Sequence, residues 1–151
     1  MRRWEKYAFN SLAMLISVSG VAYGWMKYLV QSDDPFAVVN HPLQPLMLHA
    51  HVLAAPVLLV VFGIVFNSHV GRKVGGQVAN RRSGLVSLMS MVVMTASGYL
   101  LQVTTADGLR HAWLVLHLLS GGFFVLAYSI HMIISARMWL GSAGLHQTFV
   151  A

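Results

Sequence analysis

Four long apolar stretches, separated by short polar segments, make up most of the sequence. Each stretch fits the roughly 20 apolar residues that a helix needs to cross a bilayer. We predict transmembrane helices over residues 7–30, 43–68, 85–103 and 111–140. Because little chain remains outside them, the expected fold is an all-α membrane protein, a four-helix bundle that forms one domain over residues 1–151.

The composition supports this assignment. Of the 151 residues, 57% are hydrophobic and only 9% are charged, against about 25% charged residues in an ordinary soluble domain. A soluble fold of this size could not hide so much apolar surface. The chain has no cysteine, which rules out disulfides, thiolate metal sites and the covalent attachment of c-type haem.

The net charge of +6 is a topology signal, because its distribution does not fit a nucleic-acid-binding surface. Eight of the ten Lys and Arg residues lie on alternate polar segments: Arg2, Arg3, Lys6, Arg72, Lys73, Arg81, Arg82 and Arg137. Cytoplasmic loops are enriched in Lys and Arg, so both termini are predicted to be cytoplasmic. The first apolar stretch is longer than the core of a cleaved signal peptide, which predicts a retained helix.

The two halves of the chain resemble each other, which predicts a duplicated helical hairpin. The dipeptide Ser-Gly at 19–20 recurs at 97–98. The string that begins at His51 recurs in similar form at His117, with a somewhat shorter offset. The two offsets differ because the loop between the first two helices is longer than the loop between the last two. The duplication places His51 and His117 at equivalent depths in the membrane.

Four histidines in the second and fourth stretches form a pattern. His51 and His69 are 18 residues apart, which is five whole helical turns at about 100° per residue. His117 and His131 are 14 apart, about 40° short of four turns, so each pair shares one helix face. We expect His51 to meet His117 near the outer surface and His69 to meet His131 towards the cytoplasm. His49 points about 160° away from His51.

Histidines at two levels of a bundle suit two haems with bis-imidazole ligation, because imidazole is a good iron ligand and bundle cores hold such sites. Ionisable groups inside a membrane are costly and usually mark a functional site. The competing interpretation is that the histidines hydrogen-bond between helices and that the small residues near them only allow close helix packing.

The pattern is similar to the four-helix di-haem cytochrome b subunits of bacterial formate dehydrogenases, nitrate reductases and hydrogenases. The matching stretches are 49–56, 67–70, 81–84, 97–100 and the pair His117 and His131. The resemblance implies a multi-pass protein of the bacterial inner membrane, with His51, His69, His117 and His131 as axial ligands of non-covalent haem b. It also implies electron transfer between quinone and a redox partner, such as a periplasmic cytochrome or iron–sulfur protein of a larger oxidoreductase complex. The first helix carries no histidine, in contrast to several of those families.

Other polar residues are weaker candidates. Tyr99, Gln102, Arg110 and His111 gather near the predicted outer surface, where they could contact a quinone headgroup or simply anchor the helices. The basic pair Arg72 and Arg81 could contact haem propionates or anionic lipid. No catalytic residues are predicted, because the four acidic residues lie near helix ends or in loops.

Two other functions stay open at this point. The chain could be a haem-free membrane anchor of a larger complex, with the histidines serving helix packing. It could also be a small ion or metal transporter, although such proteins usually have broken helices and charges near the midplane.

Overall fold

The computed structural model describes residues 2–67, 71 and 81–148, and the regular structure within these ranges is entirely helical. The helices are α1 (Arg3–Tyr28), α2 (Gln44–Val65), α4 (Arg81–Val103) and α5 (Asp107–Thr148). All four are long and apolar enough to span a membrane, α5 by its segment Asp107–Met138. The prediction of an all-α protein with four membrane-spanning helices is confirmed.

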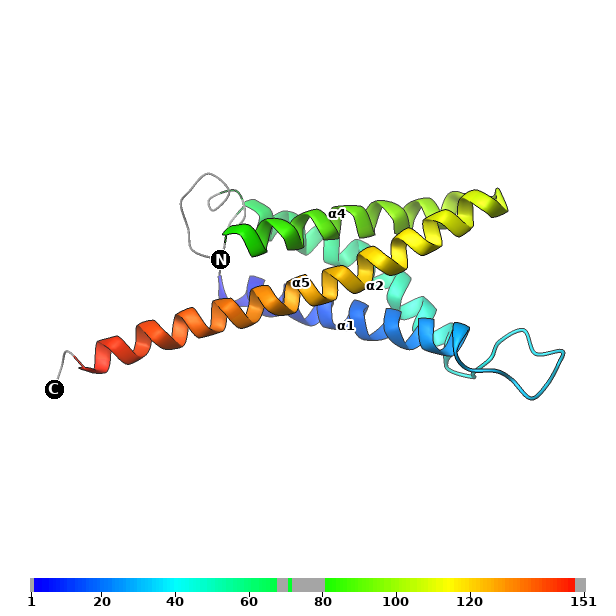
Figure 1. The fold of residues 1–151 in the computed structure, drawn as a ribbon, viewed down its shortest axis with the longest axis horizontal. Helices are drawn as coiled ribbons and strands as arrows, with labels where there is room; N and C mark the ends of the chain where they lie inside the picture. The colour runs from blue at the N-terminus through cyan, green and yellow to red at the C-terminus, as the bar shows by residue number, and fades with distance from the viewer. Residues whose placement is uncertain (1, 68–70, 72–80, 149–151) are drawn as a thin grey trace. The chain divides into compact units, whose positions relative to one another are not determined.

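The chain divides into two compact units, residues 1–75 and 76–151. In the first unit α1 packs against α2, and in the second α4 packs against α5 (Figure 1). Phe9 near the start of α1 lies beside Phe62 near the end of α2, with ring centroids 6.2 Å apart. Each unit is therefore an antiparallel helical hairpin. We call the end with the interhelical connection the closed end and the other the open end.

Several helices begin or end a few residues away from the positions predicted from the apolar stretches. α1 and α4 each begin four residues before the predicted start, with arginine as first residue, and α5 begins at Asp107. Helical hydrogen bonding continues into polar residues, and an acidic residue in the first turn is stabilised by the helix dipole. α2 ends at Val65, three residues before the predicted end, and residues 66–67 have the wider hydrogen bonding of a π-turn.

The face of α4 that meets α5 carries small side chains. Ser87, Ser90 and Ser97 are buried there. Each hydroxyl donates to a carbonyl three or four residues earlier in its own helix, over 2.9 Å. The hydroxyls are thus satisfied within an apolar contact, and their small size lets the two helix backbones approach each other closely.

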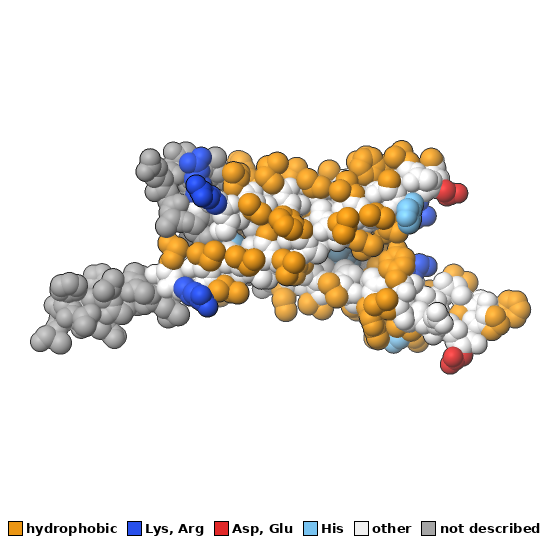
Figure 2. Space-filling view, in the orientation of Figure 1, with side chains coloured by type: hydrophobic (Ala, Val, Ile, Leu, Met, Phe, Trp, Pro, Cys, Tyr) orange, Lys and Arg blue, Asp and Glu red, His pale blue; other side chains and the backbone are white. Residues whose placement is uncertain are grey.

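Large apolar side chains on the other helix faces are exposed. Examples are Leu53 (70% exposed) and Val60 (68%) on α2, and Leu119 (68%) and Leu126 (65%) on α5. Figure 2 shows such side chains covering the helices, whereas charged side chains lie towards helix ends and connections. Exposed apolar area of this extent is unusual in a water-soluble protein and is what a protein dissolved in lipid presents.

Candidate functional site

His51 lies on the face of α2 that packs against α1. Its Nδ1 is 2.9 Å from the main-chain oxygen of Ile16 on α1. A carbonyl oxygen only accepts hydrogen bonds, so Nδ1 carries the proton and donates. In a neutral imidazole the lone pair then resides on Nε2, the nitrogen that can bind a metal.

Gly20 lets the His51 ring come this close to α1. A Cβ atom at position 20 would lie 2.7 Å from Cε1 and 2.9 Å from Nδ1 of His51, closer than real Cβ contacts. Ser19, beside it, donates its hydroxyl to the carbonyls of Leu15 and Ile16, over 2.7 Å and 3.2 Å. The Ile16 carbonyl thus accepts from both the serine and the histidine, using its two lone pairs.

His117 on α5 repeats this arrangement in the second hairpin. Its Nδ1 is 3.0 Å from the main-chain oxygen of Met94 on α4. A Cβ atom at Gly98 would lie 3.0 Å from Cε1 of the ring. Ser97 donates its hydroxyl to the Met94 carbonyl over 2.9 Å and lies 3.4 Å from Nδ1.

The two arrangements correspond position by position. Ile16 and Gly20 match Met94 and Gly98 at the same offset at which Ser-Gly recurs in the sequence. In each, a carbonyl four residues before the glycine holds the imidazole in one tautomer. We call this unit, a histidine with the Ser-Gly pair and carbonyl that contact it, a histidine cradle.

His131 occupies a related cradle at the open end of the second hairpin. Its Nδ1 is 3.1 Å from the Ser83 hydroxyl, and a Cβ atom at Gly84 would lie 3.4 Å from its Cε1. A hydroxyl both donates and accepts, so the bond to Ser83 leaves either tautomer open. Along both α4 and α5 the two cradles are separated by nearly four helical turns, about 21 Å along the axis.

The remaining predicted ligand, His69, lies outside the described residues, as does Arg72. The shared face predicted for His51 and His69 depends on counting about 100° per residue along an unbroken helix. Within the described residues α2 ends at Val65, and residues 66–67 follow as a π-turn. Val65 follows His51 at the same spacing at which His131 follows His117, so it is the counterpart of His131 in the first hairpin.

The predicted quinone contacts lie at the closed end of the second hairpin. Tyr99 and Gln102 are near the end of α4, Arg110 and His111 are in the first turns of α5, and all four are exposed. The Gln102 amide donates to the Gly98 carbonyl of its own helix over 3.3 Å. Arg81, the predicted propionate or lipid contact, begins α4 at the open end and is exposed.

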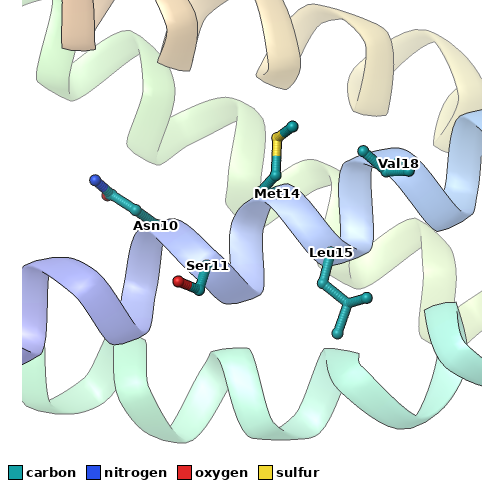
Figure 3. A pocket seen from close by; sticks show the side chains of 5 residues that line it. All are labelled: Asn10, Ser11, Met14, Leu15 and Val18. Atoms are coloured by element: carbon teal, nitrogen blue, oxygen red, sulfur yellow. The ribbon is translucent and has the colours of Figure 1, made fainter.

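A shallow surface depression follows one stretch of α1 and is separate from these cradles. It is lined by Asn10, Ser11, Met14, Leu15 and Val18 (Figure 3). Ser11 and Leu15 point to a different side of the helix from Asn10 and Met14. The described residues that line it include no histidine and no charged side chain, so we assign it no part in the candidate site.

No three His, Asp or Glu side chains gather into a metal-binding group within the part of the chain that the structure describes. His49 is exposed, whereas His51 two residues later is half-buried in its cradle. No known protein family matches the chain, and no curated protein or solved structure matches it. The candidate site therefore consists of the three histidine cradles.

Proposed function

We propose that this protein is a membrane cytochrome b that carries electrons between a quinone pool and a redox partner. His51 and His117 are assigned as the axial ligands of one haem b and His131 as a ligand of a second. The observation that carries the proposal is the equivalence of the first two cradles, in which a main-chain carbonyl fixes the proton on Nδ1. In each of these two cradles the imidazole would offer Nε2 as a ligand for haem iron.

At metal sites in general, a group that hydrogen-bonds to the second ring nitrogen of a histidine ligand holds that ligand in place. The cradles would act on the haem-ligating histidines in the same way. A hydrogen bond from Nδ1 to a carbonyl orients the ring, fixes the tautomer and raises the basicity of the ligating nitrogen. Gly20 permits that bond, because a Cβ there would lie 2.7 Å from the ring and would displace it, and at Gly98 a Cβ would lie 3.0 Å from the ring, which would then have to shift slightly. The residues present therefore fit haem ligation through Nε2.

When bound, haem supplies a one-electron iron couple whose potential depends on axial ligands, hydrogen bonds and burial. The chain contributes the rest of what electron transfer needs. The apolar helices exclude water around the cradles, and the rigid helix pairs hold each imidazole so that little rearrangement accompanies a change of charge. The chain carries no cysteine to attach the group, so binding is non-covalent.

The partners follow from this assignment. We place the protein in the bacterial inner membrane as the quinone-reactive, electron-transfer subunit of an oxidoreductase complex. Hydrogen-bond donors for a quinone headgroup come from the exposed group at the closed end, Tyr99, Gln102, Arg110 and His111. Arg81 at the open end is available to haem propionates or lipid phosphates. His69 remains our predicted second ligand at the level of His131.

One observation favours a second function, that of a haem-free membrane anchor. Each described cradle histidine has a hydrogen-bond partner on the neighbouring helix of its own hairpin. Such bonds stabilise helix pairs in membranes by about 0.6 kcal/mol on average, without any cofactor. In that case the cradles would serve only to join the helices of each hairpin.

Matched histidine variants separate the two functions. We expect His51→Ala and His117→Ala each to remove the same haem from the purified protein, because bis-imidazole binding needs both ligands. His49→Ala, two residues away on an exposed position, serves as the control and should keep its full haem content. The measurement is the haem-to-protein ratio after acid–acetone extraction. Equal haem content in all three variants would contradict the ligand assignment.

A further inference from the structure

Ser97 is the serine of the closed-end cradle in the second hairpin. It lies in the contact between α4 and α5 and is only 1% exposed. Its hydroxyl donates to the Met94 carbonyl over 2.9 Å, and Nδ1 of His117 donates to the same oxygen over 3.0 Å. One carbonyl oxygen therefore accepts hydrogen bonds both from a serine and from a candidate haem ligand.

The two donors compete for the electron density of that oxygen. A carbonyl has two lone pairs, but each proton that binds draws charge from the oxygen and weakens its attraction for the other proton. The hydrogen bond from His117 is therefore weaker than it would be without the serine. The contact between Oγ of Ser97 and Nδ1 of His117 does not offset this effect. Its length of 3.4 Å exceeds the range of about 2.7–3.2 Å for ordinary N–H···O bonds.

The corresponding serine of the first hairpin, Ser19, shares its carbonyl less. Its hydroxyl donates to the Leu15 carbonyl over 2.7 Å and to the Ile16 carbonyl over 3.2 Å. The shorter bond thus goes to Leu15, whereas Nδ1 of His51 donates to Ile16. The hydroxyl of Ser19 therefore draws less charge from the acceptor of its histidine than the hydroxyl of Ser97 does. The two cradles correspond in position but differ in this hydrogen bond.

We propose that Ser97 is a positioning residue that raises the reduction potential of the haem bound by His117, and that Ser19 acts more weakly through His51. This inference rests on the proposed function. A hydrogen bond from Nδ1 to a carbonyl raises the basicity of a histidine ligand, so a serine that weakens the bond lowers that basicity. Oxidised iron carries one more positive charge than reduced iron, and a less basic ligand therefore favours the reduced form. Axial ligands and the hydrogen bonds around them are among the factors that set the potential of a haem.

The test is a redox titration of the purified full-length protein, followed at the visible bands of its haem. Ser97→Ala leaves the Met94 carbonyl to His117 without a competing hydroxyl, so the potential should fall. We expect about a threefold decrease in the ratio of reduced to oxidised haem, the effect of one weak hydrogen bond, or about 30 mV for one electron. Ser97→Cys, whose thiol is only a weak donor, should lower the potential in the same direction. Ser19→Ala should lower it by less than Ser97→Ala.

The matched control is Ser90→Ala. Ser90 is buried on the same helix, and its hydroxyl donates over 2.9 Å to the carbonyl of Ser87, three residues earlier. The variant therefore removes the same atom from the same helix contact, but it leaves the hydrogen bonds to the Met94 carbonyl in place. The potential should not move in this variant.

The outcomes separate the inference from the proposed function on which it rests. An unchanged or higher potential in Ser97→Ala would overturn the inference and leave the proposed function intact. An equal fall in Ser90→Ala would also overturn it, because the loss of any buried hydroxyl from α4 would then have the same effect. A folded protein without any haem would instead overturn the proposed function.

Discussion

The imidazoles of His51 and His117 reach the main chain of the neighbouring helix because a glycine stands at each contact. The hydrogen bond from the imidazole to the main-chain carbonyl needs the space that the glycine leaves by having no Cβ. Any side chain at Gly20 would occupy the position of the ring, and the ring would then lose the Ile16 carbonyl as acceptor. Glycine is costly within a helix, by about 1 kcal/mol relative to alanine, so its presence here indicates a need for close approach.

Substitution of the glycine should therefore act on the ligand. In Gly20→Ala the new Cβ would lie 2.7 Å from Cε1 of His51, so the ring must move. We expect partial or complete loss of the haem bound by His51, and destabilisation by about 1–3 kcal/mol, as for other overpacked sites. The control is Gly24→Ala on the same helix, where a Cβ meets nothing within 4 Å. Haem content and thermal unfolding check both, and equal haem loss in the two variants would contradict the cradle.

We expect Ser83 to contribute more to haem binding than Ser97. Ser97→Ala leaves the Met94 carbonyl as acceptor for His117, so we expect its haem to be retained. Ser83→Ala removes the hydroxyl 3.1 Å from Nδ1 of His131, a bond worth about 0.5–1.5 kcal/mol, and should weaken binding at that level. Haem dissociation to apomyoglobin measures both. Faster loss from Ser97→Ala than from Ser83→Ala would be the opposite of this expectation.

The sequence identified the histidines as candidate site residues, but it did not identify the groups on the neighbouring helix that contact their rings. Ionisable residues in apolar stretches stand out, and the spacing of His117 and His131 correctly predicts that both lie on one face of α5, which contacts α4. The role of Ser-Gly could not be told from composition, because small residues near a histidine equally indicate close helix packing. One signal was available: the dipeptide occurs at 83–84 and again at 97–98, the same spacing as that of the two histidines that it contacts.

At the scale of the helices, the contact between α4 and α5 depends on small side chains. Ser87 and Ser90 lie between the two cradles of the second hairpin and are buried against α5. Without a hydrophobic effect between helices in lipid, close packing is what holds such a pair together. The separation set by these serines is thus the separation at which His117 and His131 reach α4.

A larger residue in this contact should separate the helices. Ser90→Leu enlarges the side chain of a residue that is only 6% exposed, and overpacking of this kind costs about 1–3 kcal/mol. We expect a lower unfolding temperature in detergent together with weakened haem binding. Val93→Leu, on an exposed position of the same helix, is the matched control. Similar unfolding temperatures for the two variants would show that Ser90 does not set the helix separation.

The extent of each helix was only partly predictable. Apolar stretches mark the residues that fit into lipid, so the existence of the four helices followed from hydrophobicity alone. The ends did not, because hydrogen bonding carries α5 from Asp107 to Thr148 through polar residues. The π-turn after Val65 is a change in backbone winding, to which a count of hydrophobic positions is insensitive.

For the molecule as a whole, the distribution of charge predicts the orientation in the membrane. The connection at the closed end of the first hairpin holds Asp33 and Asp34, whereas basic residues precede α1 and begin α4. We expect reporter fusions after Ala151 and near Gly76 to be cytoplasmic and fusions near Asp34 to be periplasmic. A periplasmic reporter at Ala151 would reverse the orientation and place the cradles of His51 and His117 nearest the cytoplasm.

The reduced-minus-oxidised visible spectrum of the purified, folded protein shows whether the chain binds haem. We expect a Soret band and sharp α and β bands of low-spin haem b, with all of the haem removed by acid–acetone because no cysteine can hold it. His51→Ala and His117→Ala should abolish the same component of that spectrum. A folded protein without a Soret band would show that the protein is not a cytochrome and that the cradles are hydrogen bonds that only join helices.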